Sequence, residues 1–291
     1  GAFDTRPLPT NGEYAVFNPA NIFARLDVPA HYTVVTTGVT RLTVAAGDRQ
    51  TIEAVAADSR DFVIAMGRDL AVNEVEVDGT RLRILSPSDE ALMGRHIARW
   101  ATVAMEALTA AYGHVSVREI DIVEAPLFIA LGQEFPGLVL VDLHHKDGPY
   151  LRDDLHAWTV SHELAHQWWS MEVGSDARDS PWLDEALASH GSAIVAQATL
   201  GRDAIELRYD QDIRAPLAEL RRTGEGDLRA DLPGEAYDIY QYSAIVYGRA
   251  ALFVDAVQRT LGEQAFSKAM HAYLDAHRGS MANADDLLKE W

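Results

Sequence analysis

The chain contains no cysteine and no long apolar run. Among its 291 residues the absence of cysteine excludes disulfides and thiolate metal ligands, so any bound metal must be held by His, Asp or Glu. No apolar stretch approaches the eighteen or more residues that a membrane helix needs, so we expect no membrane span. A hydrophobic fraction of 48% is typical of a globular protein with a sizeable core.

Basic residues are scarce relative to acidic ones. Lys and Arg number 25 and Asp and Glu number 44, which gives a formal net charge of -19. A surface of that sign repels phosphate backbones, so the composition excludes nucleic acid as an expected partner.

The first part of the chain has the pattern of a β-rich region. Residues 18–85 consist of short β-branched stretches such as "YTVVTTGVT" and "RLRIL", separated by Gly, Pro, Asp and Asn. A helical pattern then runs from Pro87 to Gly113. We therefore predict a β-rich N-terminal domain over residues 1–86 and a second domain over residues 87–291.

The second domain is predicted to be mainly helical. Two strands, within 115–127 and 137–143, are joined by a connector that contains Gly and Pro. The helices predicted after them cover roughly residues 155–170, 181–200, 203–223, 240–261, 263–277 and 284–291. The fold class expected from this order is α+β.

One stretch has the spacing of a metal site. "AWTVSHELAHQWWSMEV" contains His162, Glu163 and His166 in the pattern H-E-x-x-H. On a helix, residues four apart share a face, so both imidazoles can point at one ion. Glu163 is rotated by about 100° from His162, which places it on the flank as a general base and not as a ligand. The competing interpretation is a pair of surface histidines on an amphipathic helix.

A catalytic zinc needs three protein ligands and one open position. A third histidine in H-E-x-x-H-x-x-G-x-x-H is excluded, because the Gly and His positions hold Trp169 and Glu172. "SPWLDEALASH" offers Glu185 instead, on a segment that Ser180 and Pro181 open as a helix. We predict His162, His166 and Glu185 as metal ligands.

These residues resemble the M1 family of zinc aminopeptidases, which includes aminopeptidase N and leukotriene A4 hydrolase. Eighteen residues separate His166 from Glu185, the family's H-E-x-x-H-x18-E spacing, and "WLDEA" is similar to its W-L-N-E-G. Asp184 and Ala186 depart from that motif. The resemblance implies one zinc ion per chain.

Glu134, in "GQEF", resembles the Glu of the family's G-x-M-E-N, which binds the free α-amine of the substrate. Gln133 replaces Met and Phe135 replaces Asn, so the resemblance implies exopeptidase specificity less directly than it implies zinc. Read without the resemblance, Glu134 is a solvated loop residue.

Tyr247, in "VYGRA", resembles the Tyr of the family's Y-x-K-G, which helps to hold the developing oxyanion. Arg249 and Ala250 replace the Lys and Gly. Read without the resemblance, a tyrosine on an apolar helix face belongs to the core.

The resemblance also implies an architecture. The β-rich region looks like the latter part of the family's saddle domain, and the remainder looks like its thermolysin-like, mainly helical zinc peptidase domain. The β stretch is most similar to exported bacterial members, which favours an extracytoplasmic location.

The function that the resemblance implies is hydrolysis of N-terminal residues from peptides with a free N-terminus. Glu163 is then the general base and Tyr247 the hydrogen-bond donor to the oxyanion. One alternative is a zinc endopeptidase, or another zinc hydrolase, that has no free-amine requirement. Two others are a non-catalytic peptide-binding module and a scaffold with a structural zinc, although retention of Glu163 argues against the module.

Overall fold

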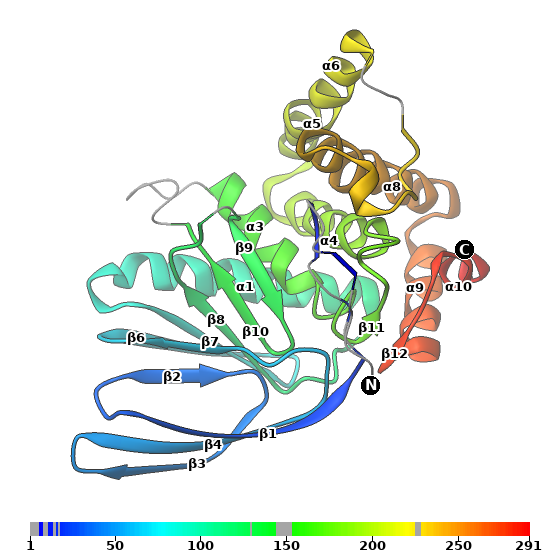
Figure 1. Cartoon of the computed structure of the whole chain (residues 1–291). Helices are drawn as coiled ribbons and strands as arrows, with labels where there is room; N and C mark the ends of the chain where they lie inside the picture. The colour runs from blue at the N-terminus through cyan, green and yellow to red at the C-terminus, as the bar shows by residue number, and fades with distance from the viewer. Residues whose placement is uncertain are drawn as a thin grey trace. The chain divides into compact units, whose positions relative to one another are not determined.

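The structure is a computed structural model that describes residues 6–7, 11–13, 16, 18–128, 130–143, 153–224 and 228–291. Strands dominate the first part of the chain and helices the second, as the sequence predicted (Figure 1). The chain divides into two compact units, and each is described by itself. One comprises Asn18–Glu106 with His114–Gln167, and the other comprises Gly1–Phe17, Ala107–Gly113 and Trp168–Trp291.

The unit that contains Asn18–Glu106 is built around a five-stranded sheet with the order β6-β7-β8-β10-β9. Strands β7, β8 and β10 run parallel, and β6 and β9 pair antiparallel at the two edges. Asp78 and Gly79, both with positive φ, form the tight turn between β6 and β7. The strands are β6 Leu70–Val77, β7 Thr80–Pro87, β8 Glu119–Glu124, β9 Gly132–Phe135 and β10 Leu138–Val141.

The N-terminal strands form two further sheets. A three-stranded antiparallel sheet has the order β1-β4-β3, and β2 pairs with β5. Along β4 the buried residues Ile52, Ala54 and Ala56 alternate with more exposed ones, which is the two-residue period of a strand with one covered face. The bounds are β1 Ala20–Pro29, β2 Thr33–Thr36, β3 Val39–Ala46, β4 Arg49–Ser59 and β5 Ile64–Gly67.

A compact apolar cluster joins β2 and β5 to the five-stranded sheet. Val35 packs with Leu85, Val123 and Leu138, which come from β7, β8 and β10. Each of the three sheet residues is at most 5% exposed. Burial of these aliphatic side chains stabilises the unit that carries the first half of the candidate site. The predicted boundary near Ser86 stays a prediction; β7, which ends at Pro87, pairs with β8.

The long helix predicted after the β-rich region is present as α1, Ala91–Tyr112, preceded by the 3₁₀ turn η1, Ser88–Glu90. It ends at Gly113, which has φ 97°. A methyl group built on Gly94 would lie 2.5 Å from Oγ of Ser86, so α1 crosses β7 closely enough to require glycine. Its fully buried residues recur at helical spacing: Ile97, Ala101, Ala104 and Leu108.

The helix that carries H-E-x-x-H is α3, Asp153–Ala165, and it packs against β9 and β10. The sequence placed its end near Ser170, and that boundary is wrong. The amide of His166 still bonds to the carbonyl of His162, but Ser170 has φ 114°, a backbone conformation in which an L-residue is strained. Trp168 and Trp169 lie inside the predicted helix, and because both are apolar and neither is Gly or Pro, the sequence did not mark this turn.

The other unit is mainly helical. A helical run that includes α5 and α6 and another that includes α7 and α8 occupy the predicted ranges 203–223 and 240–261, but each contains a π-helical segment that hydrophobic periodicity did not reveal. The short strands β11, Val173–Gly174, and β12, Ser280–Met281, pair in parallel. The helical segments are α4 Trp182–Leu200, α5 Arg202–Tyr209, η2 Asp210–Arg214, α6 Ala215–Thr223, η3 Gly234–Ala236, α7 Ile239–Gln241, η4 Tyr242–Arg249, α8 Ala250–Leu261, α9 Glu263–His277 and α10 Ala284–Glu290.

None of the helices among the described residues has the length and hydrophobicity required to cross a bilayer.

Candidate metal centre

The two histidines of the motif point at a common position. Nε2 of His162 lies 3.2 Å from Nε2 of His166, and the two rings are nearly perpendicular, at 87°. Two nitrogens that bind one tetrahedral zinc at about 2.0–2.1 Å stand about 3.3–3.4 Å apart. The imidazole pair therefore has nearly the nitrogen–nitrogen separation that a shared zinc ion needs.

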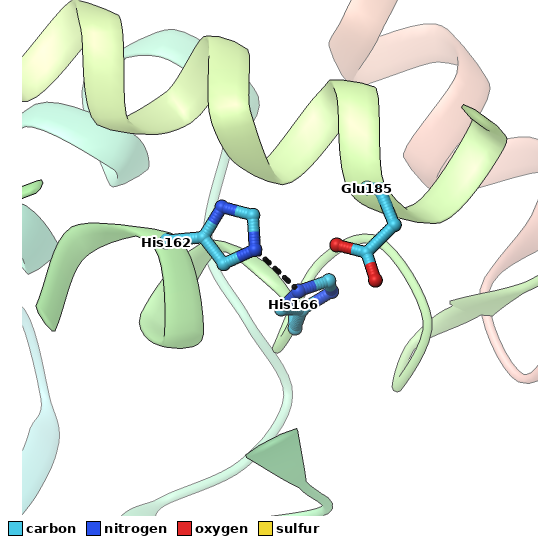
Figure 2. Close-up of side chains that lie close together, drawn as sticks. All are labelled: His162, His166 and Glu185. Atoms are coloured by element: carbon cyan, nitrogen blue, oxygen red, sulfur yellow. Dashed lines mark hydrogen bonds between the residues drawn. The ribbon is translucent and has the colours of Figure 1, made fainter. Parts of the chain in front are cut away.

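Glu185 offers a third ligand atom. One oxygen of its carboxylate and one nitrogen from each of His162 and His166 all lie within 4.8 Å of one another, and all three residues are buried (Figure 2). Glu185 stands in the first turn of α4, where the helix dipole favours a negative charge. Two imidazoles and one carboxylate are the donor set of a catalytic zinc site, so the residues fit the metal that the sequence predicted.

Glu163 occupies the flank of the histidine pair. Its side chain is only 6% exposed, and its carboxylate lies against the backbone of Gly132 in β9. A methyl group built on Gly132 would stand 2.3 Å from Oε1 of Glu163. Only glycine leaves room for the carboxylate at this point. The motif "GQEF" contains Gly132, but its spacing did not predict this role.

Glu134 joins the same group of side chains. Ligand atoms of Glu134, Glu163 and His166 lie within 4.8 Å of one another, and Glu134 is 8% exposed. Nε2 of Gln133 donates a hydrogen bond of 3.0 Å to Oε2 of Glu134. This carboxylate is therefore buried beside the metal centre, which is not the environment of a solvated loop residue.

Tyr247 contacts Glu185, one of the three predicted ligands, directly. Its hydroxyl donates a 2.5 Å hydrogen bond to Oε1 of Glu185. The phenol lies on the π-helical segment η4 and is half-buried. In this arrangement its proton is directed at Glu185, so donation to a substrate oxyanion would require the hydroxyl to exchange that partner. The role of Tyr247 at the oxyanion stays a prediction.

Gln167 fixes the strand that carries Glu134. Its Nε2 donates to the carbonyl of Phe135 at 3.0 Å, and its Oε1 accepts from the amide of Gly137 at 2.9 Å. The end of the metal helix is thereby bonded to the turn between β9 and β10. This role could not be predicted from the sequence, because a glutamine next to a histidine motif is more often exposed to solvent than buried.

A buried histidine pair holds the start of α3. Nδ1 of His156 lies 3.1 Å from Nε2 of His96 on α1, and neither side chain is more than 7% exposed. Burial, followed by the neighbouring His156, lowers the pKa of His96, which favours its neutral form. The pair ties α3 to α1 and does not belong to the ligand group.

Comparison with known proteins identifies the family of the chain. Residues 103–291 match the family model described as the Peptidase family M1 domain. The chain belongs to peptidase family M1. This confirms the family that the sequence resembled.

Individual M1 relatives are distant and longer. Aminopeptidase N of Lactococcus lactis subsp. lactis is 29% identical over 135 residues, which cover 45% of this chain and 16% of the relative. Aminopeptidase M1-A of Oryza sativa subsp. japonica is 24% identical over 229 residues, which cover 74% of this chain and 25% of the relative. The chain therefore matches about a quarter or less of the length of these relatives.

Solved structures share the fold. The M1 zinc metallopeptidase of Deinococcus radiodurans superposes with a TM-score of 0.67 at 20% identity, covering 95% of this chain and 61% of that one. A mutant form of the same protein gives a TM-score of 0.70 at 19% identity. The β-rich region followed by a mainly helical one is thus an arrangement that M1 metallopeptidases have, which confirms the expected α+β class.

Proposed function

We propose that this M1 chain is a zinc-dependent aminopeptidase that removes N-terminal residues from peptides. The observation that carries the proposal is the convergence of His162, His166 and Glu185, with Glu163 buried on the flank of the histidine pair. The M1 relatives named above are called aminopeptidases, which supports the same activity.

The metal supplies Lewis-acid chemistry. When zinc is bound by these three residues, it would polarise the scissile carbonyl and lower the pKa of a water molecule towards neutrality.

Glu163 moves the proton. Its carboxylate would accept a proton from the attacking water and then deliver it to the nitrogen of the leaving amine, so one side chain serves as base and then as acid. The packing of this carboxylate on Gly132 restricts where it can stand, which favours a fixed direction of proton transfer.

Glu134 would fix the register of the substrate. A carboxylate buried beside Glu163 and His166 attracts a cation, and the free α-ammonium of a peptide is a cation of suitable size. Gln133 already donates to Oε2, which orients the carboxylate for that ammonium. A substrate held by its terminal amine would place its first peptide bond near the metal centre.

Tyr247 would act on the developing oxyanion. Its hydroxyl lies beside the ligand Glu185, and a donor at that place strengthens its bond as negative charge grows on the carbonyl oxygen. The interaction would therefore raise turnover more than affinity.

The experiment compares a free aminoacyl anilide with its N-acetyl derivative. The purified chain should hydrolyse the free substrate, lose that activity after chelation and recover it when zinc is restored. Glu134→Ala should lower kcat/KM on the free substrate by about 10-fold to 150-fold, as expected for a charge-assisted hydrogen bond worth roughly 1.5–3 kcal/mol. The low rate on the acetylated substrate should stay nearly constant.

Equal losses on both substrates would remove Glu134 from amine recognition and favour a zinc endopeptidase. Activity that survives complete removal of zinc would refute the proposal as a whole.

A further inference from the structure

The phenol of Tyr247 stands on an uncommon helical geometry. π-Helical hydrogen bonds are rare, usually span one turn, and occur often at functional sites. Here η4 extends over eight residues, Tyr242–Arg249, and the amide of Ala250 bonds to the carbonyl of Ile245, five residues earlier. One extra residue in a helical turn rotates the following side chains by about 100°. The π geometry therefore decides which way Tyr247 faces.

A second π-helical segment packs against the first. η2, Asp210–Arg214, contributes Ile213, which is 4% exposed. The approach is closest at Gly248, where an added methyl carbon would lie 3.1 Å from Cγ2 of Ile213 and 3.7 Å from its Cβ and Cγ1. Carbon atoms pack best at about 3.5–4.0 Å, so only the Cγ2 contact is too short.

Gly248 is the residue that follows Tyr247 in the chain, so any displacement of its backbone moves the phenol. The phenol has little freedom to absorb such a movement. Its ring packs edge-on against Tyr242 at 5.8 Å, and its hydroxyl holds a 2.5 Å bond to Glu185. A helix with glycine in its interior is less stable than the same helix with alanine. The close approach to Ile213 is a physical reason for glycine at position 248.

We propose that Gly248 and Ile213 are positioning residues, and that their contact sets the phenol of Tyr247 at the metal centre. The inference rests on the proposed function, in which Tyr247 acts on the substrate. It adds that the reach of the phenol is set by the packing of two π-helical segments.

The test begins with Gly248→Ala. The added methyl group should push η4 away from η2 and shift Tyr247, and we expect kcat on a free aminoacyl anilide to fall about tenfold, since a displacement near 1 Å can cost about 10²-fold. KM should change little, because the phenol serves the transition state. The zinc content and the unfolding temperature of the variant should show that it is folded and that it binds zinc.

Two substitutions at Ile213 separate a specific contact from general damage. Ile213→Leu keeps the side-chain volume and lacks Cγ2, so in the Gly248→Ala background it should restore most of kcat. Ile213→Val retains Cγ2 and should restore none. Equal rescue by both variants, or by neither, would overturn the proposed contact.

A third comparison asks whether the effect passes through the phenol. In a Tyr247→Phe background, which keeps the ring and lacks the hydroxyl, Gly248→Ala should cause no further loss of kcat. A full tenfold loss in that background would show that Gly248 acts on something other than Tyr247 and would overturn the inference.

The outcomes also separate this inference from the proposed function. A wild-type chain with zinc that hydrolyses neither substrate would refute both. An active wild type whose Tyr247→Phe variant keeps full turnover would leave zinc-dependent hydrolysis in place and overturn both the oxyanion role of Tyr247 and the positioning role of Gly248 and Ile213, because there would be no catalytic phenol to position.

Discussion

At the residue scale, the candidate site depends on close packing as much as on the metal ligands. Glu163 is buried against Gly132, and Glu134 is oriented by Gln133. Both carboxylates belong to the group that includes His166. The position of each acid is therefore set by an uncharged neighbour, which makes those neighbours useful sites for mutation.

The general base can be tested without disturbing the metal. Glu163→Gln keeps the size of the side chain and all three ligands, so zinc content should stay unchanged. Turnover should fall by at least 10²- to 10⁴-fold, the usual contribution of general base catalysis. Asp154→Asn, on an exposed position of the same helix, is the matched control and should keep wild-type turnover. A Glu163→Gln variant with near-normal turnover would remove Glu163 from the mechanism.

Gly132→Ala is expected to separate activity from stability. The new methyl carbon would lie 2.3 Å from Oε1 of Glu163 and 2.4 Å from its Cδ and Cγ, so the side chain from Cγ outward would have to turn aside while the backbone stays in place. The displaced carboxylate should lower kcat by about 10²-fold, while the unfolding temperature changes little. In a Glu163→Gln background the same substitution should have almost no effect on kcat. A large loss of stability instead would show that the backbone, and not the carboxylate, gives way.

At the element scale, a buried histidine connects three helices of the helical unit. Nδ1 of His190 on α4 lies 3.0 Å from the hydroxyl of Tyr112 on α1, and its Nε2 lies 2.8 Å from Oε1 of Gln258 on α8. An amide oxygen only accepts, so Nε2 carries the proton and Nδ1 accepts from Tyr112. Burial lowers the pKa of His190 to about 4.

This histidine should make folding sensitive to mild acid. A lowered pKa means that the unfolded state binds the proton more readily, so the stabilisation is fully present above about pH 6.5 and is lost as the pH falls towards about 4. The loss should be on the order of 3 kcal/mol. Urea unfolding between pH 7 and pH 4 measures it. His190→Gln should reduce the change in the free energy of unfolding between pH 7 and pH 4. An unchanged pH dependence in this variant would assign it to other groups.

The three residues predicted as ligands could be read from the sequence because their spacing is local. His162, His166 and Glu185 follow from helix geometry and one short connection, and the structure brings them together. Gly132, Gln167 and the π-helical segments were missed because their roles depend on contacts that form only in the folded chain. The end of the metal helix was misplaced because Trp168 and Trp169 continue an apolar pattern through a turn.

At the scale of the whole molecule, zinc should contribute to stability as well as to chemistry. A metal that binds only the folded state stabilises it by about 4 kcal/mol when its free concentration is a thousand times Kd. For a chain of this size we expect the unfolding temperature to rise by roughly 7 °C. Calorimetry with zinc and with chelator measures the shift. His166→Ala should remove the zinc-dependent shift, and a variant that keeps it would place the metal elsewhere.

Ser170 shows where this molecule could become more stable. With φ at 114°, it adopts a backbone conformation that costs an ordinary residue about 1–3 kcal/mol and glycine much less. The strained residue follows His166 by four positions and reverses the chain before α4, with its amide bonded to the carbonyl of Val173. In evolutionary terms a single change to glycine would relieve the strain. The serine would persist only if selection tolerates a marginally stable turn, or if the stiffness of a non-glycine residue there keeps the connection between the ligand-bearing helices in one conformation.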